Sequence, residues 1–407
     1  MDYINRDMEK LVSDLVREYS CILLTGPRQV GKTTMFRHAD AARKAVSLDD
    51  FQERDLARND PELFLSSHRV PILIDEVQYA PELFSYIKIA IDNGAAPGSF
   101  FLTGSQSFRL MKLAQESLAG RVAVLNLMPL SQGEIYGDRS ICEPFRIENA
   151  YSNGFPRGLH DVDAIGIYKR MWVGGLPAYV SGKHSNRNIF FSSYLQTYVS
   201  RDIAQDLALR DSSGFVDFIR AAACRVGCEL NVHSIALDVG VSDDTASRWL
   251  GLLEKSQVIF YLHPFSNNLL KRTVKRPKLY FFDTGLVAYL TRYSSPDILM
   301  NGSINGEILE NHVVSEIRKS YLNSGEEPLM YYFRDKDGKE IDLILEYDGK
   351  LHPIEIKKSS NPTQDMVRNF NVLEKTGAQI GMGAVICLKN KASMLSRNVA
   401  IVPVGAL

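Results

Sequence analysis

Short apolar runs that end in polar residues recur through the first third of the chain. They cover residues 21–25, about 45–48, 71–76, 99–105 and 122–127. Continuous apolar runs of this length are typical of strands buried on both faces of a parallel sheet. The pattern therefore predicts an α/β fold over residues 1–137, with a parallel sheet that collects the polar strand ends at one edge.

In the middle of the chain the hydrophobic pattern changes from short apolar runs to helical spacing. Residues 138–210 lack strand alternation, and Tyr168, Met171 and Trp172 recur at helical spacing, which predicts a helical linker or lid with these side chains in its core. Further along, Gly240 interrupts one helical pattern and Ser242 is suited to N-cap the next. On that second helix the apolar residues share one face, namely Ala246, Trp249, Leu250 and Leu253.

This helix, tight turn and helix is a helix-turn-helix pattern, and an apolar run at 258–262 would open a β-wing. We therefore expect a winged-helix domain over 211–295. Residues 296–407 show a long helix at about 305–322 and then three strand-like runs at 330–334, 340–347 and 351–357. Asp-Gly pairs at 337–338 and 348–349 are hairpin signals, so the last part is expected to be a mixed α/β domain.

Composition limits the class of protein. The 407 residues include 47 Lys and Arg against 48 Asp and Glu, a net charge of −1, with 45% hydrophobic and 23% charged residues. These values predict a soluble cytoplasmic globular protein of two or three domains, with no membrane segment. Five scattered cysteines argue against a disulfide framework, and Cys224 and Cys228 are interpreted as buried thiols. Near-neutral charge excludes a cationic coat over the whole protein but leaves local basic patches open.

The first apolar run leads directly into Gly26-Pro27-Arg28-Gln29-Val30-Gly31-Lys32-Thr33, which matches the phosphate-loop pattern G-x-x-x-x-G-K-[ST]. Its glycines let backbone N–H groups approach phosphate, and the following helix N-terminus favours negative charge. Lys32 would reach the terminal phosphates and the Thr33 hydroxyl would ligate Mg²⁺. The predicted ATP-binding residues are Gly26, Pro27, Arg28, Gln29, Val30, Gly31, Lys32, Thr33 and Thr34.

Other strand ends supply candidates for the chemistry. Asp75 would hold Mg²⁺, and Glu76 would act as the general base toward water. Ser105, or Thr103, would sense the terminal phosphate or position that water. Arg121 and Arg109 are candidates to stabilise transition-state charge, in cis or on a neighbouring molecule, and an ordinary surface arginine remains the alternative for each. The catalytic candidates are Lys32, Glu76, Arg121 and Ser105.

Together these segments resemble one family, the bacterial and archaeal AAA-type ATPases of the AAA_14/DUF4143 type. The resemblance rests on Tyr3-Ile4-x-Arg6, GPRQVGKTT at 26–34, LIDEVQ at 73–78, FLTGSQ at 101–106, LAGR at 118–121, GGLP at 174–177 and YLQTYVSRDI at 194–203. It implies an AAA+-like P-loop core that uses ATP and Mg²⁺.

A basic cluster makes DNA a candidate partner. Five basic residues lie within 271–278, and Arg248 lies on the outer face of the second helix of the helix-turn-helix. Asp243 and Asp244 at the start of that helix would repel DNA. A solvated hairpin, or a winged helix that binds protein, remains the alternative. The candidate DNA contacts are Arg248, Lys271, Arg272, Lys275, Arg276 and Lys278.

The C-terminal part carries a second constellation. Asp342 is followed thirteen to fifteen residues later by Glu355-Ile356-Lys357, which is similar to the PD-(D/E)xK nuclease motif, and Glu310 matches the helix carboxylate of that fold. Carboxylates on adjacent strands beside a lysine bind Mg²⁺ and activate water. Ordinary charged hairpin faces, and a nuclease fold that only binds, remain open.

Three functional hypotheses follow. The leading one is an Mg²⁺-dependent ATPase that couples its nucleotide state to DNA or partner binding through winged-helix and restriction-endonuclease-like regions. The alternatives are an ATP-regulated, metal-dependent nuclease and a non-enzymatic nucleotide-gated switch. Oligomerisation is compatible with each of them.

Overall fold

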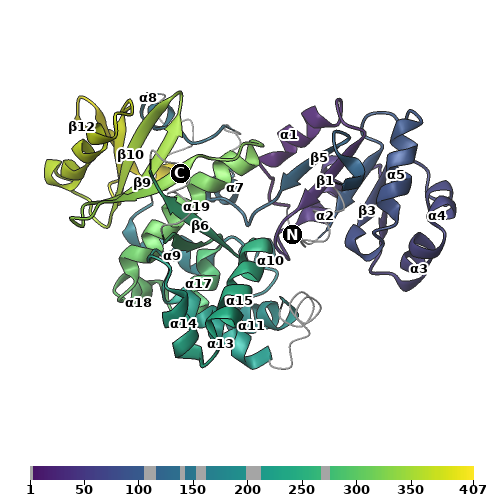
Figure 1. Cartoon of the computed structure of the whole chain (residues 1–407), viewed down its shortest axis with the longest axis horizontal. Helices are drawn as coiled ribbons and strands as arrows, with labels where there is room; N and C mark the ends of the chain where they lie inside the picture. The colour runs from purple at the N-terminus through teal and green to yellow at the C-terminus, as the bar shows by residue number, and fades with distance from the viewer. Residues whose placement is uncertain (1–2, 105–115, 138–142, 153–161, 199–211, 267–275) are drawn as a thin grey trace.

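The computed structural model describes residues 3–104, 116–137, 143–152, 162–198, 212–266 and 276–407. The N-terminal lobe, which ends near residue 137, stands to the right in Figure 1, and the remaining elements form a larger lobe beside it. In the described ranges, no helix is long and apolar enough to span a bilayer.

A five-stranded parallel sheet forms the N-terminal lobe, in the order β2-β3-β4-β1-β5. Its strands are β1 (Cys21–Thr25), β2 (Lys44–Ser47), β3 (Ile72–Asp75), β4 (Phe100–Thr103) and β5 (Val122–Asn126), and its helices are α1 (Met8–Leu15), α2 (Lys32–Ala39), α3 (Phe51–Asn59), α4 (Pro61–Ser67) and α5 (Leu83–Asp92), with the short 3-10 helix η1 (Val77–Tyr79). All neighbouring strands run parallel. The predicted α/β fold and parallel sheet are confirmed, including the extra strand between the phosphate loop and Asp75.

A series of helices follows the N-terminal sheet, of which α7 is bonded to both lobes and the later ones pack in the larger lobe. They are α7 (Gln132–Tyr136), α8 (Ile147–Ser152), α9 (Ala164–Val173), α10 (Pro177–Val180) and α11 (Arg187–Tyr198). As the helical spacing predicted, Tyr168 and Met171 are fully buried, and Trp172 is partly buried against the same core. The segment NGFPRG at 153–158 lies outside the described residues.

The helix-turn-helix comprises α14 (Val232–Val239) and α15 (Asp243–Lys255), preceded by α13 (Ser212–Ala223). Gly240 ends α14 in a left-handed conformation with φ +76°, and the Ser242 hydroxyl accepts a hydrogen bond from Thr245 N at 3.2 Å. All four apolar residues predicted on one face of α15 are buried, and Trp249 packs edge-on against two phenylalanine rings of α13. Cys224 and Cys228, expected to be buried, are exposed because they follow the buried face of α13 into the connecting turn.

The expected wing exists but is not free. β6 (Ile259–Pro264) pairs antiparallel with β7 (Lys278–Phe281), and β6 also pairs parallel with β8 (Met330–Arg334) through His263↔Tyr331. The hairpin therefore forms one edge of an eight-stranded sheet ordered β12-β13-β11-β10-β9-β8-β6-β7. Hydrogen bonding in the sheet continues across the domain boundary expected between residues 295 and 296.

The remaining elements of the larger lobe complete this sheet and its covering helices. They are α17 (Thr284–Leu290), α18 (Pro296–Met300), α19 (Asn305–Asn323), β9 (Glu340–Tyr347), β10 (Lys350–Lys357), β11 (Gly383–Cys387), β12 (Ser393–Ser396), β13 (Val399–Pro403) and the 3-10 helices η3 (Gln364–Thr376) and η4 (Val404–Ala406). The three strands predicted at 330–334, 340–347 and 351–357 are present within one residue of their expected bounds. β11, β12 and β13 were not anticipated.

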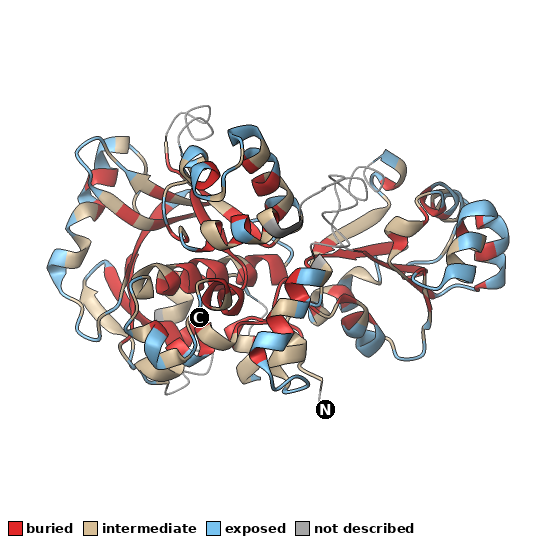
Figure 2. Ribbon diagram, turned by 90° about the horizontal axis from the view of Figure 1, so that it is seen from below, coloured by how far each residue is buried: buried red, intermediate tan, exposed pale blue. Residues whose placement is uncertain are grey.

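Helix α19 lies at the centre of the larger lobe. Nearly all its residues from Ile308 to Asn323 are buried, and it contacts β5 of the N-terminal lobe as well as β7, β10, α9 and α17. One hydrophobic cluster runs from Ile22 on β1 to Leu407 without interruption. Buried residues accordingly continue from one lobe to the other in Figure 2.

Candidate nucleotide site and its connections to the larger lobe

The phosphate loop connects β1 to α2. Gly26 has φ +142°, and a Cβ there would lie 2.1 Å from the carbonyl oxygen of Leu127, so only glycine fits. Gly31 is the N-cap of α2 with φ +92°. The Lys32 ammonium donates to the carbonyl oxygens of Gly26 at 3.0 Å and Pro27 at 2.8 Å. The loop thus curls around its own lysine at the start of a helix, as the motif predicts.

Asp75, at the carboxyl end of β3, faces the first turn of α2. The hydroxyl of Thr33 donates to Asp75 Oδ1 at 2.6 Å, and the hydroxyl of Thr103, from the end of β4, donates to the same oxygen. Three elements therefore bring a hydroxyl–carboxylate pair and a third polar group to one sheet edge. Hydroxyl and carboxylate oxygens are the ligands that Mg²⁺ prefers, and a single carboxylate suffices when phosphates and water supply the rest. The residues present fit a magnesium ion bound together with nucleotide.

Glu76 follows Asp75 in a left-handed conformation, with φ +56°. This conformation costs a non-glycine residue roughly 1–2 kcal/mol and turns its side chain away from the strand direction. Its carboxylate accepts a hydrogen bond from the Gln78 amide. The backbone reversal therefore places a second, separately oriented carboxylate beside Asp75.

Three further predicted residues, Ser105, Arg109 and Arg121, have different outcomes. Ser105 and Arg109 lie outside the described residues. Arg121 lies at the opposite edge of the sheet, because it precedes β5, whose Val122 pairs with Cys21 at the start of β1. Its guanidinium donates to Asp92 at the end of α5, at 2.6 Å. The role in cis is therefore wrong: the length of β1 separates Arg121 from the loop that follows Thr25.

Arg6 is a residue whose role the sequence did not reveal, although it stands in the N-terminal motif Tyr3-Ile4-x-Arg6. It is 5% exposed. Its guanidinium donates to the carbonyls of Val30 at 2.8 Å and Met128 at 2.7 Å, and to Glu134 Oε1 at 2.9 Å. Val30 belongs to the phosphate loop and Glu134 to α7. One buried arginine thus fastens the phosphate loop to the first helix that leads out of the lobe.

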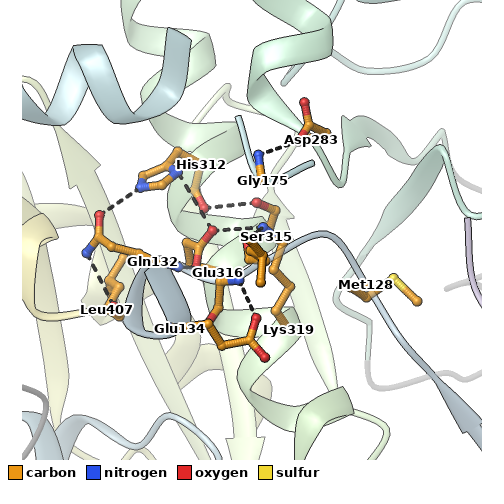
Figure 3. A network of polar contacts seen from close by, with 12 residues as sticks. Met128, Gln132, Glu134, Gly175, Asp283, His312, Ser315, Glu316, Lys319 and Leu407 are labelled. Atoms are coloured by element: carbon orange, nitrogen blue, oxygen red, sulfur yellow. Dashed lines mark hydrogen bonds and ion pairs between the residues drawn. The ribbon is translucent and has the colours of Figure 1, made fainter. Parts of the chain in front are cut away.

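Glu134 also holds α7 in place. Its carboxylate accepts from the backbone N–H groups of Asp7 at 2.9 Å and Ser131 at 2.8 Å, and the Ser131 hydroxyl caps the helix in return. Gln132, the first residue of α7 after the Ser131 cap, donates its backbone N–H to Glu316 on α19 at 2.7 Å. Figure 3 shows Gln132 and Glu134 of α7 close to Glu316 of α19. α7 is therefore bound by side chains from both lobes.

Glu316 is a buried carboxylate with a full set of partners. Lys319 Nζ lies 2.8 Å from its Oε1, and the same ammonium donates to the Leu130 carbonyl at 3.2 Å. These contacts hold the pKa of Glu316 below its usual range despite burial. Burial lowers the pKa of the neighbouring His312 to about 4, so this histidine is neutral at physiological pH.

The GGLP segment is the second link between the lobes. The Leu130 N–H donates to the Gly175 carbonyl at 2.8 Å, and the Gly175 N–H donates to Asp283 Oδ2 at 2.6 Å. A Cβ on Gly174 would lie 2.5 Å from the other Asp283 oxygen. At the end of the segment, Pro177 lies 3.9 Å from where a Cβ of Gly31 would be. This turn therefore lies beside the phosphate loop.

The carboxylates predicted in the C-terminal domain do gather on adjacent strands. Lys357 Nζ lies 3.0 Å from Asp342 Oδ2 and 2.5 Å from Glu355 Oε2, and Asp342 Oδ2 also accepts from Ile356 N at 2.8 Å. Glu355 is 3% exposed, and its Oε1 has no hydrogen-bond partner among the described residues. Burial, then the charge of Asp342, raises the pKa of Glu355 to about 8.

Glu310 on α19 is bound by Tyr280 and Lys278 and not by Lys357. Its Oε1 accepts from Tyr280 Oη at 2.6 Å and lies 3.0 Å from Lys278 Nζ, and the same ammonium lies 2.6 Å from Glu340. Burial raises the pKa of Glu310, and Asp342 raises it further. Throughout the described ranges, no three His, Cys, Asp or Glu side chains converge closely enough to hold a metal. The structure therefore does not fit a three-carboxylate metal site.

Lys278 is consequently not available as a DNA contact. It is 5% exposed and ion-paired to two glutamates, because β7 is an edge strand that α19 covers and not the tip of a free wing. Arg248 is exposed on α15, where the pattern placed it. Arg276 is described just ahead of β7. Lys271, Arg272 and Lys275 lie outside the described residues.

Comparison with known proteins covers most of the chain. Family models match residues 18–136 (AAA domain), residues 166–297 (a domain of unknown function, DUF8612) and residues 305–407 (a domain of unknown function, DUF4143). Over 354 residues the chain is 30% identical to the uncharacterized proteins Rv2008c of Mycobacterium tuberculosis and Mb2031c of Mycobacterium bovis, covering 84% of this chain and 71% of each relative. Among solved structures, the Walker-type ATPase PABY2304 of Pyrococcus abyssi aligns with 71% of this chain and 96% of its own, at 17% identity and TM-score 0.43.

Proposed function

Since the chain belongs to the AAA-type P-loop ATPases of the AAA_14/DUF4143 kind, we propose that it binds ATP on residues 26–34 and hydrolyses it with Mg²⁺. The magnesium ion, bound by Thr33 and Asp75, would neutralise charge on the phosphates. Lys32 would exchange its contacts with the loop carbonyls for phosphate oxygens. Glu76 would accept a proton from the attacking water, and Thr103 would fix Asp75 from the neighbouring strand.

The observation that carries this proposal is the contact of Thr33 with Asp75 at 2.6 Å. These residues are far apart in sequence and come from different elements. Their contact assembles a hydroxyl and a carboxylate at the start of the helix where phosphate would bind. An unrelated glycine-rich turn has no reason to bring a strand-end carboxylate to this position.

Steady-state ATP hydrolysis in Mg²⁺ tests the proposal. Lys32→Ala should lose nucleotide binding and turnover together. Glu76→Gln should retain ATP binding but lose turnover by about 100-fold or more, the usual contribution of a general base. Arg37→Gln, a change on the exposed side of α2, is the matched control. Turnover at the wild-type rate in both Lys32→Ala and Glu76→Gln would refute the assignment.

We further propose that the nucleotide state is coupled to binding of DNA or a partner by the larger lobe. The support is the hydrogen bond from Arg6 to the Val30 carbonyl of the phosphate loop, together with the GGLP turn that lies beside Gly31. Any displacement of the loop by phosphate acts on α7 and, through Gln132, on α19. α19 also carries Glu310 of the C-terminal cluster, so one buried helix is bonded to α7 and contributes to that cluster.

DNA binding is tested by anisotropy of a labelled duplex at several salt concentrations, with ADP and with a non-hydrolysable ATP analogue. If α15 contacts DNA phosphates, Arg248→Gln should reduce the slope of the log binding constant against log salt concentration by about one. Lys183→Gln, an exposed change in the turn after α10, is the control. An absence of binding at every salt concentration and in both nucleotide states would eliminate DNA and leave a protein partner.

A second candidate function is phosphodiester cleavage at Asp342, Glu355 and Lys357. The observation that favours it is the buried Glu355 Oε1, which has no hydrogen-bond partner among the described residues. Plasmid and single-stranded substrates should be tested with Mg²⁺ and Mn²⁺, comparing wild type with Asp342→Ala. Cleavage that disappears in Asp342→Ala would establish the nuclease. No cleavage with any metal would assign the cluster a binding role.

A further inference from the structure

A cavity lies between α9, the end of α7 and the turn after β11, and none of its lining residues belongs to the nucleotide site. It has a volume of about 760 Å³. Its polar lining includes Arg170, Lys169, Tyr136 and Asn390, and Val162 and Val173 supply apolar walls. We call this the Arg170 cavity. Its size lies within the range of pockets that hold small ligands.

Arg170 is the unusual member of this lining. It is only 9% exposed, yet its guanidinium makes no hydrogen bond or ion pair with any residue that the structure describes. A guanidinium carries five N–H donors and remains charged in proteins. Burying such a group without hydrogen bonds is costly, and buried charges are normally paired. The donors of Arg170 are therefore open toward the cavity.

The nearest carboxylates do not satisfy it. Glu316 and Asp283 act on Arg170 electrostatically and oppose the lowering of its pKa, which is caused mainly by burial. Both carboxylates are already used. Glu316 accepts from Gln132 N and pairs with Lys319, and Asp283 accepts from the backbone N–H groups of Gly175 and Leu286. They compensate the charge of Arg170 from a distance and leave its N–H groups without acceptors.

The rest of the lining favours a dianion. Lys169 adds a second positive charge from an exposed position at the cavity rim, and Asp163, whose Oδ1 caps α9 through Gly166 N at 2.9 Å, is the only acidic side chain in the described lining. A planar guanidinium offers two parallel donors to a tetrahedral oxyanion, and an adjacent ammonium contributes a point charge. A phosphate group uses both cations, whereas a single carboxylate needs only the guanidinium.

We propose that the Arg170 cavity binds a phosphate-bearing anion, held by the Arg170 guanidinium and Lys169. The site is separate from the phosphate loop: it is built from α9, α7 and the turn after β11. No contact in it uses residues 26–34. Arg170 also lies within electrostatic range of Glu316, the α19 residue that receives the Gln132 N–H, so occupancy of the cavity adds negative charge next to the junction of the two lobes.

The experiment measures thermal stability and binding of the full chain in a Lys32→Ala background, which removes phosphate binding by the loop. Inorganic phosphate is titrated at constant ionic strength, with acetate, AMP and a short single-stranded DNA as separate arms. Phosphate should raise the melting temperature, since a ligand that binds only the folded state stabilises it. Arg170→Gln should weaken phosphate binding by about tenfold or more, the size of one or two lost charge-assisted hydrogen bonds. Lys183→Gln should leave it unchanged.

A structural role for Arg170 gives a different result. Without added anion, Arg170→Gln should melt at or above the temperature of its parent, because it removes a buried charge that makes no hydrogen bond. If Arg170→Gln melts lower and still responds to phosphate, the arginine is structural and the proposal fails. It also fails if the parent responds to none of free phosphate, AMP and DNA, or if acetate binds more tightly than all three. A response to AMP and not to free phosphate, or to DNA alone, would identify the source of the phosphate group. Because ATP turnover is not measured, these outcomes are independent of the proposed ATPase activity.

Discussion

Replacement of Arg6 by methionine should destabilise the N-terminal lobe and loosen the phosphate loop together. The change keeps most of the side-chain volume but removes the donors to Val30 O, Met128 O and Glu134. Glu134 is left with a side chain that is fully buried and has lost its counter-charge. Removing one partner of a buried ion pair costs about 3–5 kcal/mol. A domain of this size loses about 3 °C in melting temperature per kcal/mol, so we expect a drop of roughly 10 °C.

A double-mutant cycle measured by thermal unfolding separates the ion pair from the two carbonyl contacts. Glu134→Gln keeps an acceptor for one backbone N–H and no longer carries a charge. Arg6→Met combined with Glu134→Gln should therefore melt no lower than Arg6→Met alone. Arg37→Met, an exposed change on α2, should shift the melting temperature by no more than about 2 °C.

The functional readout is the affinity for ATP at a temperature where each variant is folded. Arg6→Met should weaken ATP binding because the Val30 carbonyl is no longer fixed. In the unfolding cycle, a double variant whose loss of stability equals the sum of the two single losses would show that Arg6 and Glu134 do not interact. Arg6→Met with wild-type stability would refute the reasoning altogether.

Three further outcomes follow from the site geometry. The folded-state pKa of Glu355 is raised from 4.5 to about 8, so its contribution to stability is lost as pH rises through this interval. The melting temperature of Glu355→Gln, relative to that of wild type, should therefore rise by about 3 °C or more between pH 5 and pH 8.5. Gly26→Ala should abolish nucleotide binding in an equilibrium titration, since its Cβ would collide with backbone, whereas Gly251→Ala, in an open position on α15, should raise the melting temperature slightly. Lys278→Met should cost about 3–5 kcal/mol in thermal unfolding by leaving Glu310 and Glu340 without their ammonium; a neutral effect would restore Lys278 as a surface residue.

Much of the nucleotide site was predictable because its signals are local. The strand ending at Thr25, the loop to Thr33 and the strand ending at Asp75 each follow from short apolar runs and a fixed spacing. Parallel strands bring their carboxyl ends to one edge, which is enough to expect Thr33 near Asp75. The same reasoning placed the four buried residues of α15, since helical periodicity assigns a face from the sequence alone.

Residues whose role depends on a distant partner were not predictable in this way. Arg121 carries a plausible charge, but its place at the opposite edge of the sheet follows from the pairing of β5 with β1. Lys278 stands in a basic run, yet β7 buries it between Glu310 and Glu340. Composition shows that a charge exists and periodicity shows which face carries it. Neither shows what packs against that face.

The amino-acid sequence alone determined the phosphate loop, its strand–loop–helix setting and the carboxylates on neighbouring strands, because backbone geometry and residue spacing impose these over a few residues. The tertiary structure decided how the lobes are joined. The pairing of β6 with β8, the contacts of Arg6 with Val30 and Glu134, and the open donors of Arg170 all depend on segments remote in sequence. A buried polar group without a hydrogen-bond partner costs free energy, so a partner stabilises each of these groups, and only the folded chain determines which partner is within reach.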